Sequence, residues 1–215
     1  LLYGEDTNRN GILDWNEDDG DKAPPEDNGN GRLDPGFFNY VTIHSYELNL
    51  DSNGGDRINV NRGQNRTELA QILEDEFGQT KALKILGNIP TSPIPYNNIL
   101  DFYYQARMEY EDFSKIIDRI TVDNQDRITG RINVNNAPAE VLLCLPGLEQ
   151  SDVDTLIMER QKTDTNLDNI LWVTEVLSQE KAEAIGSYIT TKSLQFSADI
   201  VAVSNDGRAF CRYYV

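Results

Sequence analysis

The sequence contains very little histidine or cysteine, and this scarcity excludes most catalytic arrangements. His44 is the only histidine, and no acid or nucleophile stands at a spacing that would suggest a catalytic triad. Cys144 and Cys211 lie in apolar surroundings, which favours buried free thiols over a disulfide. Cys/His zinc spacings, Walker loops and dinucleotide-binding glycine motifs are also missing. We therefore expect no catalytic residues and a protein that is not an enzyme.

Basic residues are scarce as well, and no apolar run is long enough to span a bilayer or act as a signal sequence. The 215 residues contain 19 Lys and Arg against 36 Asp and Glu, a net charge of −17. This balance leaves no basic surface for nucleic acid or anionic membranes. With 39% hydrophobic residues, the chain can still bury an ordinary core.

Acidic residues are abundant near the N-terminus, where they follow the ligand spacing of a calcium loop. Residues 1–36 contain ten acids and three basic residues, a net charge of −7 that is costly unless cations compensate it. Within residues 6–17, oxygen-bearing side chains occupy loop positions 1, 3, 5, 9 and 12, and Gly11 stands at position 6. These side chains are Asp6, Asn8, Asn10, Asp14 and Glu17. The alternative is a turn-rich polar segment without a metal, because Asn, Asp and Gly are also ordinary turn formers.

A weaker copy of this loop follows at residues 26–34, where Gly31-Arg32-Leu33-Asp34 parallels Gly11-Ile12-Leu13-Asp14. Its twelfth position is Phe37, so a second ion would need ligands from water or another segment, and the candidates are Asp18, Asp19 and Asp21. A simple Gly/Asn turn is the alternative. Neither loop has room for the flanking helices of a calcium sensor, because five residues precede the first and Pro24-Pro25 precedes the second. One calcium ion, and a second if the weaker loop binds, would therefore act as a structural staple.

Helical periodicity dominates the middle of the chain. A strand is expected first, at residues 39–46, from its β-branched and aromatic residues. Helices are expected at 67–77, capped by Thr67 and stopped by Gly78, and at 80–86, 98–108 and 110–120, with a proline-rich connector at 88–96.

An internal echo suggests two related helical modules. Arg57-Ile58-Asn59-Val60-Asn61 recurs as Arg131-Ile132-Asn133-Val134-Asn135, and each copy precedes a helical block; a chance match is the alternative. In the second block, we expect Asn136 to cap a helix over 137–145, Pro146-Gly147 to form a turn, and a capping box at 151–154 to open a helix through Arg160. This is a helix-hairpin-helix, followed by a helix at 179–189. Its hairpin reads Gly147-Leu148-Glu149, and an acid in place of the second glycine disfavours DNA binding.

The C-terminus changes to strand-like periodicity. Residues 193–203 and 208–215 are expected to form two strands joined by a tight turn at 204–207. Together with the strand near residue 41 they would form a small antiparallel sheet, and the helical block would be an insertion. We predict an α+β fold divided into 1–56, 57–130, 131–192 and 193–215.

Several segments resemble the general secretion pathway protein K family, the large minor pseudopilins of bacterial type II secretion. The matching features are the acidic Gly4-Glu5-Asp6 stretch with its Asn-Gly-Ile-Leu-Asp loop, the paired Asn-Val-Asn signatures, and the terminal strand pair. The most specific segment is residues 132–148, which reads Ile-Asn-Val-Asn-Asn-Ala-Pro-Ala-Glu-Val-Leu-Leu-Cys-Leu-Pro-Gly-Leu.

The resemblance implies a pilin-like body with an inserted domain of SAM-like, helix-hairpin-helix modules and with calcium bound to the body. It also implies that the full-length protein is periplasmic and anchored in the inner membrane by an N-terminal helix, so we expect the sequence to be a fragment. The implied partners are the I- and J-type minor pseudopilins at the tip of a short fibre, and possible contacts include secreted substrates. The implied ligands also include two backbone carbonyls. The carbonyl of Ile12 joins the first set, and the carbonyl of Arg32 joins a second set of Asn28, Asn30 and Asp34.

Two other functions are compatible with the sequence. A calcium-stabilised extracellular adhesion module would share the acidic loops, and binding to I- and J-type pseudopilins would distinguish the two. DNA-uptake proteins share the Asn-x-Asn and Leu-Pro-Gly motifs, but they tend to be short and basic, unlike this chain.

Overall fold

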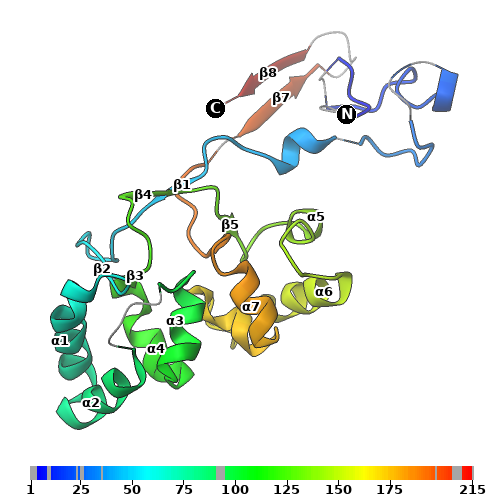
Figure 1. Ribbon diagram of the computed structural model, residues 1–215. Coiled ribbons are helices and arrows are strands. Elements are labelled where there is room, and N and C mark those ends of the chain that lie inside the picture. The colour runs from blue at the N-terminus through cyan, green and yellow to red at the C-terminus, as the bar shows by residue number, and fades with distance from the viewer. Residues whose placement is uncertain are drawn as a thin grey trace. The chain divides into compact units, whose positions relative to one another are not determined.

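The protein consists of two compact units. The computed structural model describes residues 4–8, 11–22, 24, 27–34, 36–90, 95–196, 198–204 and 210–214. One unit, here called the loop unit, contains Leu1–His44 and Gln195–Val215; the other, the helical unit, contains Ser45–Leu194 (Figure 1). Helices alternate with small two-stranded sheets, which confirms the α+β class at this coarse level. No helix among the described residues is long and apolar enough to cross a membrane.

The first half of the helical unit contains four short helices, as the sequence predicts. The first helix has Asn65 at its N-cap, two residues before the expected cap Thr67, and it ends before Gly78, which has φ 76°. Asn98 caps the third helix by accepting hydrogen bonds from the N–H groups of Leu100 and Asp101, both at 3.0 Å. The bounds are η3 Gly63–Asn65, α1 Arg66–Phe77, α2 Gln79–Asn88, α3 Ile99–Ala106, α4 Tyr110–Ile116 and η4 Ile117–Arg119. Residues 91–94 of the expected connector lie outside the described residues.

The second half contains the helix-hairpin-helix pair, with two corrections to its caps. Asn136 does not cap the first helix, because its N–H is bonded to the carbonyl of Asn133 in a turn and the helix begins only after Pro138. The capping box is formed by Glu149 and Asp152, two residues earlier than predicted, and Gly147 adopts φ 76° in the hairpin. The bounds are α5 Ala139–Leu142, α6 Gln150–Glu159, η5 Ile170–Glu175 and α7 Gln179–Ile185.

The repeated Arg-Ile-Asn-Val-Asn segments occupy equivalent places in the two halves. Each begins a short strand that pairs in parallel with a strand at the far end of its own helical block: β2 (Ile58–Asn59) with β3 (Ile120–Thr121), and β5 (Ile132–Asn133) with β6 (Ile189–Thr190). Asn59 and Asn133 each accept the N–H two residues on, at 2.8 and 2.9 Å. We call β2 to β3 the first module and β5 to β6 the second module. The sequence repeat therefore marks the same parallel strand pair, which joins the start and the end of each helical block.

A single apolar core lies in the helical unit. Among the side chains whose burial the structure describes, every buried apolar one belongs to Ser45–Leu194. Aromatic side chains are central to it: Phe102 and Phe113 are fully buried with ring centroids 6.0 Å apart, and Trp172 donates from Nε1 to Oδ1 of Asn135 at 3.1 Å. Cys144 and Cys211 are free, as predicted, but both are exposed, so the expected burial is wrong.

The predicted strand at residues 39–46 is wrong. Phe37–Tyr40 forms a 3₁₀ helix (η2), and β1 (Tyr46–Leu48) begins where the expected strand ends. β1 pairs with β4 (Arg127–Thr129) in the helical unit rather than with the C-terminal strands. Among residues that were expected to lie in a sheet, Ile43 is 94% exposed, because alternation alone supplies neither a partner strand nor a buried face.

The C-terminal strand pair is confirmed. β7 (Asp199–Val203) and β8 (Phe210–Tyr214) are antiparallel, with Ile200 opposite Tyr213. The expected turn is described only as far as Ser204, because residues 205–209 lie outside the described residues. The only other regular element of the loop unit among the described residues, besides η2, is the 3₁₀ turn η1 (Gly20–Lys22).

Candidate metal centre

The first acidic loop is folded around its own carboxylates. Gly11 has φ 73°, the left-handed conformation that the sixth position of a calcium loop requires. Its N–H donates to Oδ2 of Asp6 at 3.1 Å, so the first and sixth positions are joined. Asn8 donates from Nδ2 to Oδ2 of Asp14 at 2.7 Å, which brings together the third and ninth positions.

Glu17 closes this loop from its twelfth position. The side chain is almost completely buried, at 1% exposure. Oε1 accepts the N–H groups of Thr7 at 2.8 Å and Asn8 at 3.4 Å, and Oε2 accepts the N–H of Asp14 at 3.2 Å. One carboxylate thus holds the two sides of the loop together.

The second loop is a succession of short turns. Asn28 accepts the N–H of Asn30 at 3.0 Å, and Asn30 accepts the N–H of Arg32 at 2.6 Å. Gly29 and Gly31 both have left-handed φ values, 67° and 66°. The predicted ligands Asn28, Asn30 and Asp34, with the carbonyl of Arg32, therefore lie on one tightly wound segment.

Glu5 closes the second loop, and sequence reasoning missed it. Its carboxylate accepts the N–H of Asn28 at 3.3 Å through Oε1 and the N–H of Asp34 at 2.9 Å through Oε2, and its exposure is 2%. Aligned on their glycines, these are the third and ninth loop positions, the same two that Glu17 joins in the first loop. Glu5 therefore takes the place of the acid that Phe37 does not supply, although it comes from outside the loop.

Gly4 allows Glu5 to reach this position. It has φ 59°, and a Cβ on it would lie 1.8 Å from the carbonyl oxygen of Asp34. The N–H of Glu5 donates to the same carbonyl at 2.9 Å. Only glycine can lie so close to the second loop, so the Gly4-Glu5 pair forms a unit.

The two glutamates that close these loops are buried and bonded to the backbone. The hydrogen-bond partners of the Glu5 and Glu17 carboxylates are backbone N–H groups, and the seven ion pairs found among the described residues all lie in the helical unit. Oδ1 of Asp19 is buried with no hydrogen-bond partner in the described part of the chain. A buried carboxylate oxygen without a donor is costly unless a metal or proton compensates it.

The other predicted ligands are placed as follows. Asn10 lies outside the described residues, and Ile12 is 42% exposed beside Gly11. Asp18 donates its backbone N–H to the carbonyl of Asp14 at 3.1 Å, and the side chain of Asp21 is outside the described part. No three His, Cys, Asp or Glu side chains within the described segments converge as a metal-binding group. Since the predicted set also uses amide and carbonyl oxygens, calcium binding stays a prediction.

The sequence contains no short-range signal for Glu5. It acts on residues 23 and 29 positions away, and no ligand-spacing rule covers such a separation. His44, the only histidine, is exposed in an irregular segment where its backbone N–H donates to Oγ1 of Thr42 at 3.1 Å.

Comparisons with models of known protein families, with curated proteins and with solved structures found no match. The likeness to large minor pseudopilins therefore rests on the motifs quoted above, and the chemistry of the site on its geometry.

Proposed function

We propose that residues 5–34 bind calcium as a structural clamp in a non-enzymatic assembly protein. The observation that carries this proposal is the pair of buried glutamates, Glu5 and Glu17, each of which bridges the third and ninth positions of one glycine-containing loop. Hard cations such as calcium prefer six to eight oxygen ligands, which these loops offer from carboxylates, amides and carbonyls. The clamp would hold one ion in the first loop and, with Glu5, a second ion in the other.

A cation would also offset the burial of acids in the loop unit. Glu5, Asp6 and Glu17 are 2%, 6% and 1% exposed. Burial of apolar surface usually drives folding, so a segment that buries acids instead needs another source of stability. Binding of an ion to the folded state alone supplies it.

The assembly role that we propose is that of a large minor pseudopilin at the tip of a type II secretion pseudopilus. The grouping of the acidic loops with the C-terminal strands in one unit supports a pilin-like body interrupted by a helical insertion. The repeated modules and the Leu145-Pro146-Gly147-Leu148 hairpin support SAM-like, helix-hairpin-helix insertions. In this function the full-length protein is anchored in the inner membrane and faces the periplasm.

The helix-hairpin-helix would then serve for packing or protein contacts rather than DNA binding. The amide of the first turn of α6 that would meet a phosphate is capped by the carboxylate of Glu149. Asp152 in turn accepts the N–H of Glu149 at 2.8 Å and an ion pair from Lys181 at 2.6 Å. A phosphate would therefore meet two carboxylates instead of free N–H groups.

Terbium luminescence tests the clamp directly. Tb³⁺ substitutes for Ca²⁺ and emits strongly when a nearby tryptophan is excited. Trp15 lies in the first loop and is 85% exposed, whereas Trp172, the other tryptophan, is fully buried in the helical unit. We expect saturable emission that calcium suppresses by competition and that Trp15→Phe abolishes.

Matched glutamine variants separate the two loops. Glu17→Gln should weaken binding at the first loop, and Glu5→Gln should remove the second ion in calorimetry while leaving the first. Glu76→Gln, at an exposed acid on α1, is the control.

A chelator should lower the melting temperature of the wild type, since an ion at about a hundredfold excess over its dissociation constant contributes about 2.7 kcal/mol. An unchanged melt and no competition by calcium would exclude the clamp.

Calorimetry with I- and J-type minor pseudopilins tests the assembly role. Binding at micromolar concentration that weakens after chelation would support it. Undetectable binding with calcium present would favour the alternative of a calcium-stabilised adhesion module. The two tests are independent, because a clamp can exist in either kind of protein.

A further inference from the structure

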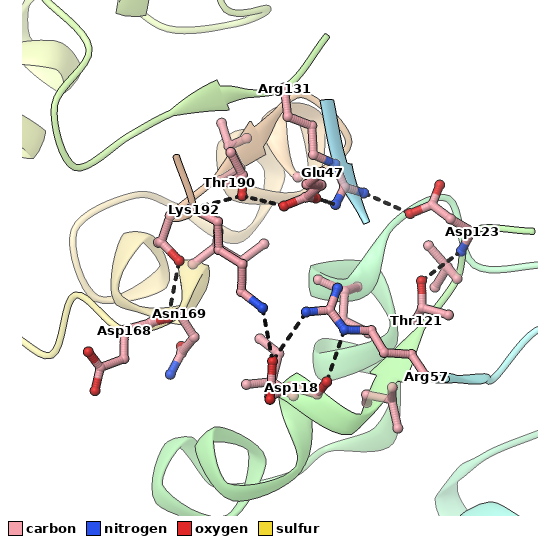
Figure 2. Close-up of a pocket in the computed structure, with 18 of the residues that line it drawn as sticks. Glu47, Arg57, Asp118, Thr121, Asp123, Arg131, Asp168, Asn169, Thr190 and Lys192 are labelled. Atoms are coloured by element: carbon pink, nitrogen blue, oxygen red, sulfur yellow. Dashed lines mark hydrogen bonds and ion pairs between the residues drawn. The ribbon is translucent and has the colours of Figure 1, made fainter. Parts of the chain in front are cut away.

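A cavity of about 400 Å³ opens inside the helical unit, between the first and second modules (Figure 2). Its volume falls in the range of small-molecule sites, about 300–1,000 Å³. The walls alternate between charged groups and aliphatic side chains. The aliphatic side chains that line it are Ile99, Ile117, Ile120, Val122, Ile170 and Ile189.

Carboxylates in this cavity are already partnered. Glu47 accepts from Arg131 through Oε1 and from Oγ1 of Thr190 at 2.8 Å through Oε2. Asp123 accepts from Nη2 of Arg131 at 2.7 Å.

Asp118 is the third partnered acid and joins the two modules. Oδ1 accepts from Nη2 of Arg57 and Nζ of Lys192, both at 3.2 Å, and Oδ2 accepts the N–H of Ser52 at 2.7 Å. Although burial raises the pKa of Asp118, the hydrogen bonds from Ser52 and Lys192 outweigh it and hold the pKa well below its usual value. The carboxylates of Glu47, Asp118 and Asp123 thus each accept hydrogen bonds from neighbouring residues.

Several donors, by contrast, have hydrogens to spare. Nε of Arg131 is buried and has no hydrogen-bond partner within the described part of the chain. The hydrogen bonds of Arg57 use Nε and Nη2, which leaves Nη1 without a partner among the described residues, and its side chain is only 11% exposed. In Figure 2 the guanidinium groups of Arg57 and Arg131 and the ammonium group of Lys192 lie around the same space. Nε of Arg131 has no surface exposed to this space, so the donors that a molecule there could meet are Nη1 of Arg57 and Nζ of Lys192.

The charges define the chemistry of that molecule. Glu47, Asp118 and Asp123 balance Arg57, Arg131 and Lys192, and Asp168 adds one exposed negative charge at the edge. The net charge of −17 repels a multiply charged phosphate more strongly than a single carboxylate, which can still accept hydrogen bonds from Arg57 and Lys192. The isoleucine walls suit a short aliphatic group attached to it.

We propose that this cavity binds a monocarboxylate with a branched aliphatic side chain, supplied either by the C-terminus of a peptide or by a free carboxylic acid. The carboxylate lies between Arg57 and Lys192, and the aliphatic group lies against the isoleucines. The site is in the helical unit and does not depend on the calcium clamp.

N-acetyl-leucine and its neutral amide form a matched pair of probes. Two-dimensional NMR of ¹⁵N-labelled protein records the Nε–H signals of arginine side chains directly. We expect N-acetyl-leucine to shift the signal of Arg57 saturably and N-acetyl-leucinamide to leave it unchanged. Isovalerate of equal or higher affinity would identify a free acid as the source, and tighter binding of a longer leucine-terminated peptide would identify a C-terminus.

Variants at an accessible position keep the test independent of folding. Lys192 is 37% exposed, so Lys192→Gln should fold and weaken N-acetyl-leucine about tenfold through loss of one charge-assisted hydrogen bond. Lys162→Gln, at an exposed lysine paired with Glu159, is the control and should bind normally. Absence of saturable shifts up to about 10 mM, equal binding of the amide, or no effect of Lys192→Gln would each overturn the proposal.

Discussion

Replacing Arg131 by methionine should destabilise the helical unit severely, because it leaves a buried charge without its partner. Glu47 in β1 is 5% exposed, and among the described residues its side chain bonds Arg131 and Thr190. Methionine keeps the apolar stem of the arginine but cannot neutralise the carboxylate. Breaking a buried ion pair in this way costs about 3–5 kcal/mol.

The double variant Glu47→Gln/Arg131→Met should recover most of that loss. A neutral amide at position 47 can still accept the hydroxyl of Thr190, so we expect stability within about 1–2 kcal/mol of the wild type. Asp123, the other acid paired with Arg131, has a side chain that is 33% exposed, so water can solvate it when the arginine is removed.

Urea unfolding monitored by tryptophan fluorescence measures both variants. In a Trp15→Phe background the signal comes from Trp172 alone, which is fully buried in the same unit as the ion pair. If Arg131→Met costs as much in the Glu47→Gln background as in the parent, the unpaired charge is not the cause of the loss, and the reasoning fails.

Three further outcomes are expected. Because the pKa of Asp118 is lowered in the folded state, its stabilising contribution is fully present above about pH 4 and is lost progressively as the pH falls from there towards the folded pKa, so the difference in urea midpoint between wild type and Asp118→Asn should shrink steadily below about pH 4. Cys144 and Cys211 are both exposed, so a thiol reagent should titrate two equivalents without denaturant; a single fast equivalent would contradict this. Gly186→Ala places a Cβ 2.4 Å from Oδ1 of Asn98, the cap of α3, and should cost about 1–3 kcal/mol in the same urea assay, whereas an unchanged midpoint would show that the cap can move freely.

Local signals in the sequence predict most of the helices. The stop at Gly78 is a short-range feature that acts as expected, and the helix predicted from residue 98 begins at Ile99 with Asn98 as its cap. The capping box at Glu149 was misplaced because Ser, Asp and Glu cluster there and several registers satisfy the same pattern. Such errors move a helix boundary without changing the fold.

Features that depend on distant partners could not be predicted. Tyr46–Leu48 is a strand because Arg127–Thr129 pairs with it, whereas Val41 and Ile43, which are better strand formers, have no partner strand in the described part of the chain and stay exposed. The second loop is closed by Glu5 through contacts that span 23 and 29 residues. Spacing rules describe ligands within one loop, so they indicated the missing acid at Phe37 but not its replacement.

The parallel pairing of β2 with β3 and of β5 with β6 has a consequence for how this chain tolerates change. Each helical block leaves and rejoins the rest of the chain at one pair of adjacent strands, so its entry and exit points are fixed by a handful of backbone hydrogen bonds. The block is a cassette: its helices can lengthen, shorten or be exchanged without altering the distance that the flanking chain must span. Two copies of the same closure in succession are what duplication of such a cassette would leave behind.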